Sequence, residues 1–400
     1  MRSLTSVLLF AVLLATGCHE SKPKLPAKGV AFADSVYGTT IVRISDKETD
    51  NYSGNGIENE YSRADAENCD GTRIILRGQD GEWYLYDRSN YAMLKHLPDL
   101  GLGEELEPRW EAAAASRFNY VHGAELRQYD ISSDTFMTIH DFTHEYPGAS
   151  FISTKTEGDA SLDRRYWCFM VEDSAFHVLA VACYDRQLDS VVGAKTGFPD
   201  GINWVSMDMS GNHCVIGYES SPAQAFARDF GTMTQLPAGA TGHMDLALTT
   251  DSTDVMVFQS NTTDSITMVD LSTGAATPLV AIPFDVNADI GLHFSGNCAG
   301  TPGWCLVSTC GAKNPDPGNT HSWMDNLLFM VELKADPRIV KLCQTRCYTG
   351  ESPTSNYFAE AYATVNRAGT RVYFGSNWGI LSPEDYTDAY ELRMPSGWNH

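Results

Sequence analysis

Short runs of alternating hydrophobic and polar residues recur along the chain, whereas helical periodicity is scarce. A turn dipeptide precedes a strand-like run at 70–76, 210–216 and 368–374. An alternating strand that ends in an acidic residue then follows, as at 83–87 (WYLYD) and 126–130 (LRQYD). The best helical candidate, the alanine-rich segment 111–115, is short and lies between strand-like runs. Because alternation over short runs is typical of β-strands, the pattern predicts an all-β protein.

The acidic residue at the end of the alternating strand recurs seven times. It occurs at Asp87, Asp130, Asp185, Asp229, Asp270, Glu332 and Glu391, with spacings of 43, 55, 44, 41, 62 and 59 residues. Short strands repeated at such a period are typical of a β-propeller, in which each four-stranded unit buries its faces against its neighbours. We therefore predict a single seven-bladed β-propeller over residues 37–400. The segment 29–42 is expected to supply an outer strand that closes the ring.

The first residues have the pattern of an export signal. Arg2 precedes an apolar stretch at 4–15, which is too short to span a bilayer, and small residues then lead directly to Cys18. This ending resembles a bacterial lipobox, so we predict a signal peptide at 1–17, lipidation of Cys18 and a tether at 18–36. The alternative is an ordinary secretory signal that ends near a cysteine. The lipobox predicts an exported lipoprotein of the cell envelope, facing the periplasm or the cell surface, which contacts the membrane only through its anchor.

The charge balance restricts the class of ligand. The chain has 28 basic and 51 acidic residues, a formal net charge of −23. Nucleic acid is therefore excluded as a partner, since phosphate recognition needs clustered Lys and Arg. An anionic ligand would therefore need a binding site that is locally basic on this acidic protein.

Propeller topology predicts such a basic site, because the starts of the innermost strands and the loops between the second and third strands lie on the same face of the propeller. Imidazole, phenol and guanidinium side chains are expected to gather there, together with neighbouring polar groups: Tyr61, Arg63, Arg109, His122, His140, His144, Asn203, Tyr218, Arg228, His243, His293, Cys310, His321, Glu360, Tyr362, Asn377 and Trp378. For any one of them the alternative is a structural hydrogen bond to a neighbouring blade.

The cysteines allow either a metal site or disulfides. The sequence has 10 cysteines, nine of them after Cys18. Topology places Cys310, His321, Cys343 and Cys347 on the same face, where they are candidate ligands of one structural zinc ion. Disulfides are the alternative in an oxidising compartment. Two further pairs, Cys168 with Cys183 and Cys298 with Cys305, flank turns and are candidates for cross-strand bridges.

Several short motifs resemble a known family. They are 107–110 (EPRW), 120–123 (YVHG), 203–206 (NWVS), 241–246 (TGHMDL), 323–326 (WMDN) and 374–379 (FGSNWG). Together they resemble the seven-bladed ulvan lyases and, more distantly, the oligogalacturonate lyases, over most of the chain after residue 37. One departure is Tyr362, at a position where related propellers often have a histidine.

The resemblance implies β-elimination of a sulfated, ulvan-like polysaccharide that contains uronic acid. It assigns proton transfer to His122, His144 and Tyr218, with His140 and Tyr184 as alternatives to the last two. It assigns the uronate carboxylate to Arg228, and substrate binding also to Arg109, Arg63, Asn203 and His243.

Two other functions remain open on the sequence. One is a non-catalytic envelope propeller that binds glycan or protein. The other is a metal-dependent enzyme that uses His243 and His293, although no carboxylate is suitably spaced in the sequence to complete that site. In each case we expect a monomer without an organic cofactor.

Overall fold

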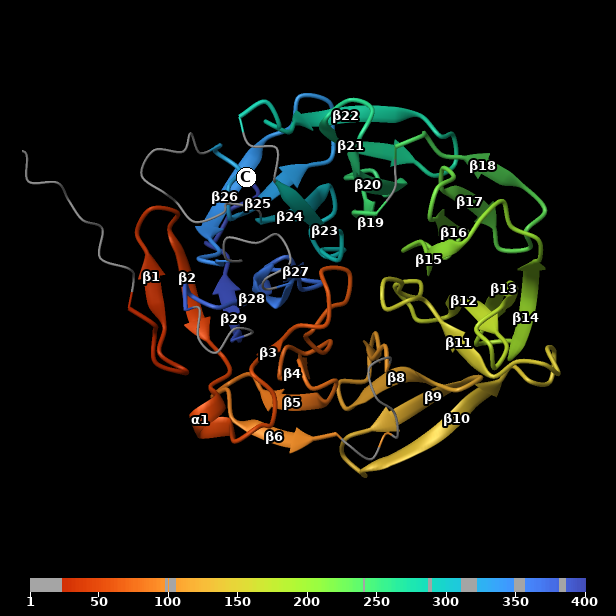
Figure 1. Cartoon of the computed structure of the whole chain (residues 1–400), viewed down its shortest axis with the longest axis horizontal. Coiled ribbons are helices and arrows are strands. Elements are labelled where there is room, and N and C mark those ends of the chain that lie inside the picture. The colour runs from red at the N-terminus through yellow and green to blue at the C-terminus, as the bar shows by residue number, and fades with distance from the viewer. Residues whose placement is uncertain are drawn as a thin grey trace, which may run out of the picture.

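The computed structural model describes residues 24–97, 100, 106–239, 242–286, 290–310, 322–348, 357–380 and 386–400. These residues form seven antiparallel sheets that are arranged as blades around a central axis (Figure 1). In every blade, strands that follow one another in sequence are hydrogen-bonded neighbours, so each blade is built from local hairpins.

The first four blades each contain four strands. Blade 1 has β3 (Ile57–Glu58), β4 (Arg73–Gly78), β5 (Trp83–Asp87) and β6 (Met93–His96). Blade 2 has β7 (Arg109–Trp110), β8 (Arg117–His122), β9 (Glu125–Asp130) and β10 (Thr135–Asp141). Blade 3 has β11 (Phe151–Ser153), β12 (Tyr166–Glu172), β13 (Val178–Asp185) and β14 (Ser190–Lys195). Blade 4 has β15 (Ile202–Met207), β16 (His213–Tyr218), β17 (Gln224–Ala227) and β18 (Met233–Gln235).

The remaining blades complete the ring. Blade 5 has β19 (Met244–Leu248), β20 (Asp254–Ser260), β21 (Ser265–Asp270) and β22 (Ala276–Ala281). Blade 6 has β23 (Gly291–Ser295), β24 (Trp304–Cys310), β25 (Leu327–Glu332) and β26 (Ile339–Gln344). Blade 7 has β27 (Thr364–Val365), β28 (Arg371–Ser376), β29 (Asp388–Arg393) and two N-terminal strands, β2 (Thr39–Arg43) and β1 (Phe32–Asp34). Helix is confined in the described residues to α1 (Lys47–Asp50) and the 3₁₀ turn η2 (Tyr357–Ala359), and none of these helices is long and apolar enough to cross a membrane.

The N-terminal segment closes the ring, as the sequence predicts. Strand β2 pairs antiparallel with β29, with Ile41 opposite Leu392, and β1 then adds outside β2. Ile41 and Val42 are fully buried, and the Thr39 hydroxyl donates to the Leu342 carbonyl of blade 6. The first and last parts of the chain therefore share one sheet. Strand β1 lies within the segment predicted as a tether, while residues 1–17 and Cys18 lie outside the described residues.

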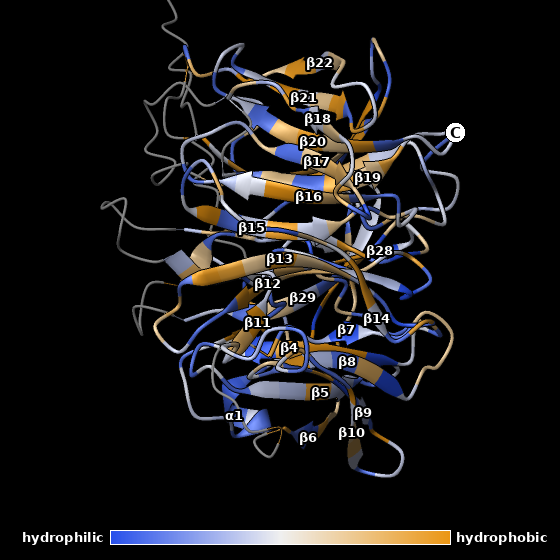
Figure 2. Ribbon diagram, turned by 90° about the vertical axis from the view of Figure 1, so that its right-hand side faces the viewer, coloured by the Kyte–Doolittle hydropathy of each residue, from blue (hydrophilic) through white to orange (hydrophobic). Residues whose placement is uncertain are grey.

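The core lies between adjacent blades. Most of the hydrophobic residues are on strands, as Figure 2 shows, and their buried side chains form clusters that join one sheet to the next. The cluster between blades 6 and 7, for example, contains Leu306, Leu328, Val372 and Phe374. Burial of each such side chain contributes roughly 1.5–3 kcal/mol, so each blade depends on its neighbours for stability.

The recurring acidic residue has a structural cause. It lies on the third strand of each blade, or in blade 4 just after it, and in most blades accepts hydrogen bonds from the turn to the fourth strand. Asp130 accepts from the Ser132 amide at 2.9 Å and Asp270 from the Ser272 amide at 2.8 Å. Glu332 instead pairs with Arg338 at 2.9 Å. The acid therefore stabilises a tight turn, which is why it recurs with the blades.

The cysteine pairing differs from the prediction. Cys168 forms a disulfide with Cys214 of blade 4, although Cys183 is its cross-strand neighbour within blade 3. The predicted Cys168–Cys183 bridge is therefore wrong, and the real bridge links two blades. Cys298 and Cys305, also predicted to pair, are both free and buried.

Candidate active site

The innermost strands bring a group of titratable side chains together near the axis. His243 precedes β19, His293 lies on β23, Tyr61 follows β3, and Glu360 and Tyr362 precede β27. The Tyr61 Oη lies 3.4 Å from His293 Nδ1, and His293 Nε2 lies 2.8 Å from Glu360 Oε2. The rings of His243 and Tyr362 lie 5.0 and 4.5 Å from the His293 ring. We call these five residues the axial cluster.

His243 is the least satisfied member of the axial cluster. Its Nδ1 is buried and has no hydrogen-bond partner among the described residues. Burial, together with the neighbouring His293 and Arg63, lowers its pKa to about 4. The imidazole is therefore neutral at ordinary pH, so the unpartnered Nδ1 is available to a ligand.

Tyr61, in contrast to His243, carries a proton that it can donate. Burial raises the pKa of its phenol, while Arg63 opposes the rise. The hydroxyl therefore keeps its proton and is suited to donate it. Arg63 lies over the Tyr61 ring at 5.8 Å and the Trp204 ring at 5.1 Å, and it pairs with Glu157 at 2.9 Å.

One set of side chains in this region could hold a metal ion. The ligand atoms of His293, Cys310 and Glu360 all lie within 4.8 Å of one another. Burial raises the pKa of the Cys310 thiol. Burial also acts to raise the pKa of Glu360, but the hydrogen bond with His293, the charge of that imidazole and a hydrogen bond from Cys310 together hold it below its ordinary value. Imidazole, thiol and carboxylate are all ligands of divalent transition metals, so the donor set fits such an ion.

A pocket of about 260 Å³ opens beside the axial cluster. Tyr61, Tyr357 and Tyr362 line it together with polar side chains from blade 1 and the start of blade 3. Several of these side chains have a buried oxygen with no hydrogen-bond partner among the described residues: Glu58, Asn59, Glu60 and Gln79. The pocket therefore offers acceptors to a ligand rich in hydroxyl groups.

Two of the predicted substrate arginines have structural partners. Arg109 is almost fully buried, pairs with Glu60 at 2.6 Å and donates to the Gly158 carbonyl at 2.9 Å. Burial still raises the pKa of Glu60 to about 7. Arg63 donates to the Gly242 carbonyl in addition to its pair with Glu157. Both guanidinium groups therefore link different blades: Arg109 joins blade 2 to its two neighbours, and Arg63 joins blade 1 to blade 3 and to the start of blade 5.

The predicted catalytic residues lie away from the axial cluster. His122 ends β8, and His144 follows β10 on the link to blade 3. Tyr218 ends β16, and its hydroxyl donates to Gln224 at 2.8 Å. Among the described residues no hydrogen bond or ring contact joins these three side chains to one another or to the axial cluster. Asn203 lies near the start of β15, on the axial side of its blade.

The alternatives His140 and Tyr184 form a separate buried group. His140 Nδ1 lies 2.8 Å from Asp189, and the Tyr184 hydroxyl donates to the same carboxylate at 2.9 Å. This group ties the outer edge of blade 2 to blade 3.

The expected position of Arg228 is wrong. It follows β17, a third strand, and therefore lies on the face opposite the end of β16, where Tyr218 lies. Its guanidinium stacks at 4.3 Å on Tyr166, the first residue of β12. Strand β17 lies between Tyr218 and Arg228, so the chain crosses from one face of the blade to the other between them.

Of the four predicted zinc ligands, one belongs to this metal-ligand set. Cys310 belongs to the set with His293 and Glu360, and His321 lies outside the described residues. Cys343 and Cys347 are buried in the hydrophobic cluster between blades 6 and 7. The carboxylate that the sequence seemed to lack beside His293 is Glu360, which lies 67 residues further along the chain.

Comparison with known proteins supports the architecture. No protein-family model matches the sequence, and no curated protein matches it. The solved structures that are similar over almost the whole chain include two oligogalacturonate lyases. An oligogalacturonate lyase from Vibrio parahaemolyticus is 14% identical, with a TM-score of 0.63, over 93% of this chain and 100% of that one. An oligogalacturonate lyase in complex with manganese is 13% identical, also with a TM-score of 0.63, over 94% and 100% of the chains.

The fold is a seven-bladed β-propeller. At this level of identity the likeness establishes the arrangement of the blades, and the chemistry has to be argued from the side chains of this chain.

Proposed function

We propose that this propeller is a polysaccharide lyase that cleaves a uronate-containing polymer by β-elimination at the axial cluster. The observation that carries the proposal is the buried His243 imidazole, whose Nδ1 has no partner, beside a protonated phenol and a His–Cys–Glu ligand set. The shared fold with two oligogalacturonate lyases supports the same class of reaction.

In this mechanism His243 Nδ1 takes the proton from C5 of the uronate. The electron pair of that bond forms the C4–C5 double bond, and the glycosidic C4–O bond breaks. Tyr61 gives its proton to the departing oxygen. His293 Nδ1, 3.4 Å from Tyr61 Oη, is placed to pass a proton from solvent to the phenolate, while His243 releases its proton to solvent, so that all three side chains return to their starting states. No water is consumed, so the products carry one new double bond.

The uronate carboxylate must be neutralised for the C5 proton to become acidic enough. A divalent cation held by His293, Cys310 and Glu360 would supply that charge. A thiol ligand favours zinc over manganese, which prefers oxygen ligands. We therefore propose zinc at this set in place of the four residues expected from the sequence. Glu360 orients His293 through the 2.8 Å contact with Nε2 in the metal-free protein.

The acceptor-lined pocket supports a substrate with a hydroxyl-rich sugar next to the uronate. Asn59 and Gln79 each present an unpartnered amide oxygen there, and Glu58 presents an unpartnered carboxyl oxygen. We propose a sulfated, ulvan-like polymer as the substrate, following the resemblance of the sequence motifs.

A non-catalytic glycan-binding propeller is the second candidate. It is favoured by one observation, that Arg63 and Arg109 are both used in inter-blade ion pairs. Such a protein would bind the polymer without cleaving it.

The test is ultraviolet absorbance of the conjugated uronate during incubation with ulvan, polygalacturonate and uncharged polysaccharides. The proposal predicts a rise that Tyr61→Phe and His243→Gln abolish and that Tyr218→Phe leaves in place. No rise with any uronate polymer from folded, zinc-loaded protein would favour the binding propeller.

The location is proposed from the N-terminal sequence. The segment 1–18 supports export and lipidation of Cys18 in the cell envelope, where an anionic polysaccharide would be met outside the cytoplasm. We propose that the chain acts there as a monomer.

A further inference from the structure

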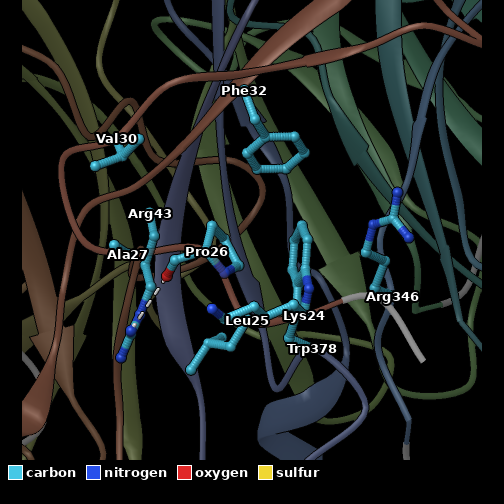
Figure 3. Close-up of a pocket in the computed structure, with 9 residues that line it drawn as sticks. All are labelled: Lys24, Leu25, Pro26, Ala27, Val30, Phe32, Arg43, Arg346 and Trp378. Carbon is cyan, nitrogen blue, oxygen red and sulfur yellow. Dashed lines mark hydrogen bonds between the residues drawn. The ribbon is translucent and has the colours of Figure 1, made fainter. Parts of the chain in front are cut away.

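A second pocket, distant in sequence from the axial cluster, lies where the N-terminal segment packs on blades 6 and 7. Its volume is about 540 Å³, within the range of ligand-binding pockets. Lys24, Leu25, Pro26, Ala27 and Val30 form one wall, and Phe32, Arg43, Arg346 and Trp378 form the rest (Figure 3). We call it the blade 6–7 pocket.

Positive charge is concentrated in the blade 6–7 pocket, in a protein with a net charge of −23. Arg43 is neutralised by Asp388 at 2.7 Å and Asp46 at 3.2 Å. Arg346 and Lys24 form no ion pair with any described residue, although most described arginines do. Two cations therefore remain for a ligand.

Trp378 is the second independent indication of a ligand. Its side chain is almost fully buried, with 4% of its surface exposed, yet its Nε1 has no hydrogen-bond partner among the described residues. The Nε of Arg346 is likewise buried without a partner. A buried donor without an acceptor costs about 1–3 kcal/mol, and an anion that accepted from both groups would remove that cost.

The two donors are held rigidly. The Trp378 ring stacks on Tyr390 at 4.9 Å, Phe32 meets it edge-on at 5.6 Å, and the Arg346 guanidinium lies 4.9 Å from it. Figure 3 shows Phe32 and Arg346 on different sides of the indole. Both Arg346 and Trp378 have a left-handed backbone, with φ of 57° and 51°, which is uncommon for residues other than glycine. Such backbones are concentrated at binding sites.

The body of the ligand must match the remaining walls. Leu25, Val30 and Phe32 offer apolar surface, which suits the ring of an organic anion better than a small inorganic ion. Trp378 follows β28 and Arg346 follows β26, so both lie on the face where the innermost strands begin and where the axial cluster opens. A polymer bound at the axial cluster would pass over this face.

We propose that the blade 6–7 pocket is a second binding site for an acidic sugar unit, whose carboxylate or sulfate is bound by Arg346, Lys24 and the Trp378 indole N–H. The choice of a sugar rests on the proposed function, whereas the choice of an anion rests on the pocket alone. Arg supplies a planar pair of donors for a carboxylate or sulfate, and Lys adds a mobile charge.

The test is isothermal titration of the full-length protein with glucuronate, galacturonate, a sulfated monosaccharide, an uncharged hexose and inorganic sulfate. The protein is freed of zinc and carries His243→Gln and Tyr61→Phe, which prevent turnover, and the second site is identified as the part of the isotherm that the Arg346 variants lose. We expect the acidic sugars to bind, and Arg346→Met to weaken them at least about tenfold. Arg346→Lys retains part of the affinity, and Trp378→Phe, which keeps the ring and removes the N–H, weakens binding several-fold. Arg117→Met, which removes an exposed arginine paired with Asp130, is the matched control and leaves binding unchanged.

Three results would overturn the inference. They are an unchanged isotherm in Arg346→Met, equal binding of the uncharged hexose, and binding of inorganic sulfate as tight as that of the sulfated sugar. The lyase proposal fails separately. If no polymer is cleaved but acidic sugars bind through Arg346, only the lyase proposal is lost. If the polymer is cleaved but the Arg346 variants bind normally, only this inference is lost.

Discussion

Replacement of His243 by glutamine tests the assignment of the base. The imidazole has a buried Nδ1 with no partner, so the substitution removes no hydrogen bond from that atom and keeps a side chain of similar size. Stability should change by less than about 1 kcal/mol, within the range of tolerated swaps. The rate of cleavage, by contrast, should fall, because glutamine cannot accept the C5 proton of the uronate. Loss of a positioned base costs about 10²–10⁴ in rate, equivalent to roughly 3–5 kcal/mol in the barrier.

The assay is the initial rate of absorbance increase with the best uronate polymer, and the thermal unfolding midpoint is measured on the same sample. His122→Gln is the matched control, since His122 also has a buried, unpartnered Nδ1, and the charged groups that act on it, Arg127 and Glu125, belong to blade 2. The control should retain the wild-type rate within about twofold. A folded His243→Gln protein with more than about a tenth of the wild-type rate would refute the assignment. Loss of activity in His122→Gln alone would move the base to the rim of blades 2 and 3, as the sequence motifs suggest.

Four further predictions concern the metal, the charge network, the ring closure and the anchor. Cys310→Ser should lower the zinc content measured by elemental analysis and reduce the rate at least about tenfold, whereas Cys343→Ser should leave the zinc content unchanged. Asp245 is buried, and burial raises its pKa to about 7 against the opposing charge of Arg63. An acid whose pKa is raised on folding loses stability as pH rises from its unfolded value through its folded value. The free energy of unfolding of Asp245→Asn, measured with urea, should therefore rise relative to that of the wild type by up to about 4 kcal/mol between about pH 4 and pH 8. A difference between the two proteins that does not change with pH would contradict the pKa shift. Ile41→Ala should cost about 2–5 kcal/mol in the same assay, because it empties a fully buried site in the closing strand, whereas the outward-facing Thr40→Ala should cost less than about 1 kcal/mol. Cys18→Ser should move the protein from the membrane fraction to the soluble fraction, and an unchanged distribution would argue against lipidation.

The ring of blades could be predicted from the sequence because its cause is local. Each acidic residue on a third strand is followed within a few residues by the turn it stabilises, as for Asp130 and Ser132. Since most blades repeat this turn, the period of the acids follows the period of the blades. The closing strand was predictable for the same reason, because β2 has the alternation of a strand and blade 7 otherwise lacks its outer strand.

The candidate site could be predicted only in part, because its contacts join distant segments. His243, His293 and Tyr61 were expected on the correct face from topology, but sequence spacing does not show that Glu360 meets His293. The disulfide shows the same limit. Cys183 is the hairpin neighbour of Cys168, yet the packing of blade 3 on blade 4 brings Cys214 closer.

The roles of the arginines were hidden for a related reason. Arg63 and Arg109 lie on segments near the propeller axis, and a basic residue at such a position is expected from the sequence to bind an anionic substrate. The structure places Glu157 and Glu60 opposite them, and both acids come from other blades or other turns. Burial makes such pairing necessary, because a buried guanidinium without an acidic partner would cost several kcal/mol of folding free energy, on the order of the penalty for an unpaired buried charge.

The most direct test of the account is the mass of the products formed from a defined acidic oligosaccharide. β-Elimination at the axial cluster predicts two fragments whose masses sum to that of the substrate, one of them carrying the unsaturated uronate. Fragments whose masses sum to the substrate plus one water would show hydrolysis, and an intact substrate from folded, zinc-loaded protein would show a binding propeller. Either of those results would contradict the proposed lyase.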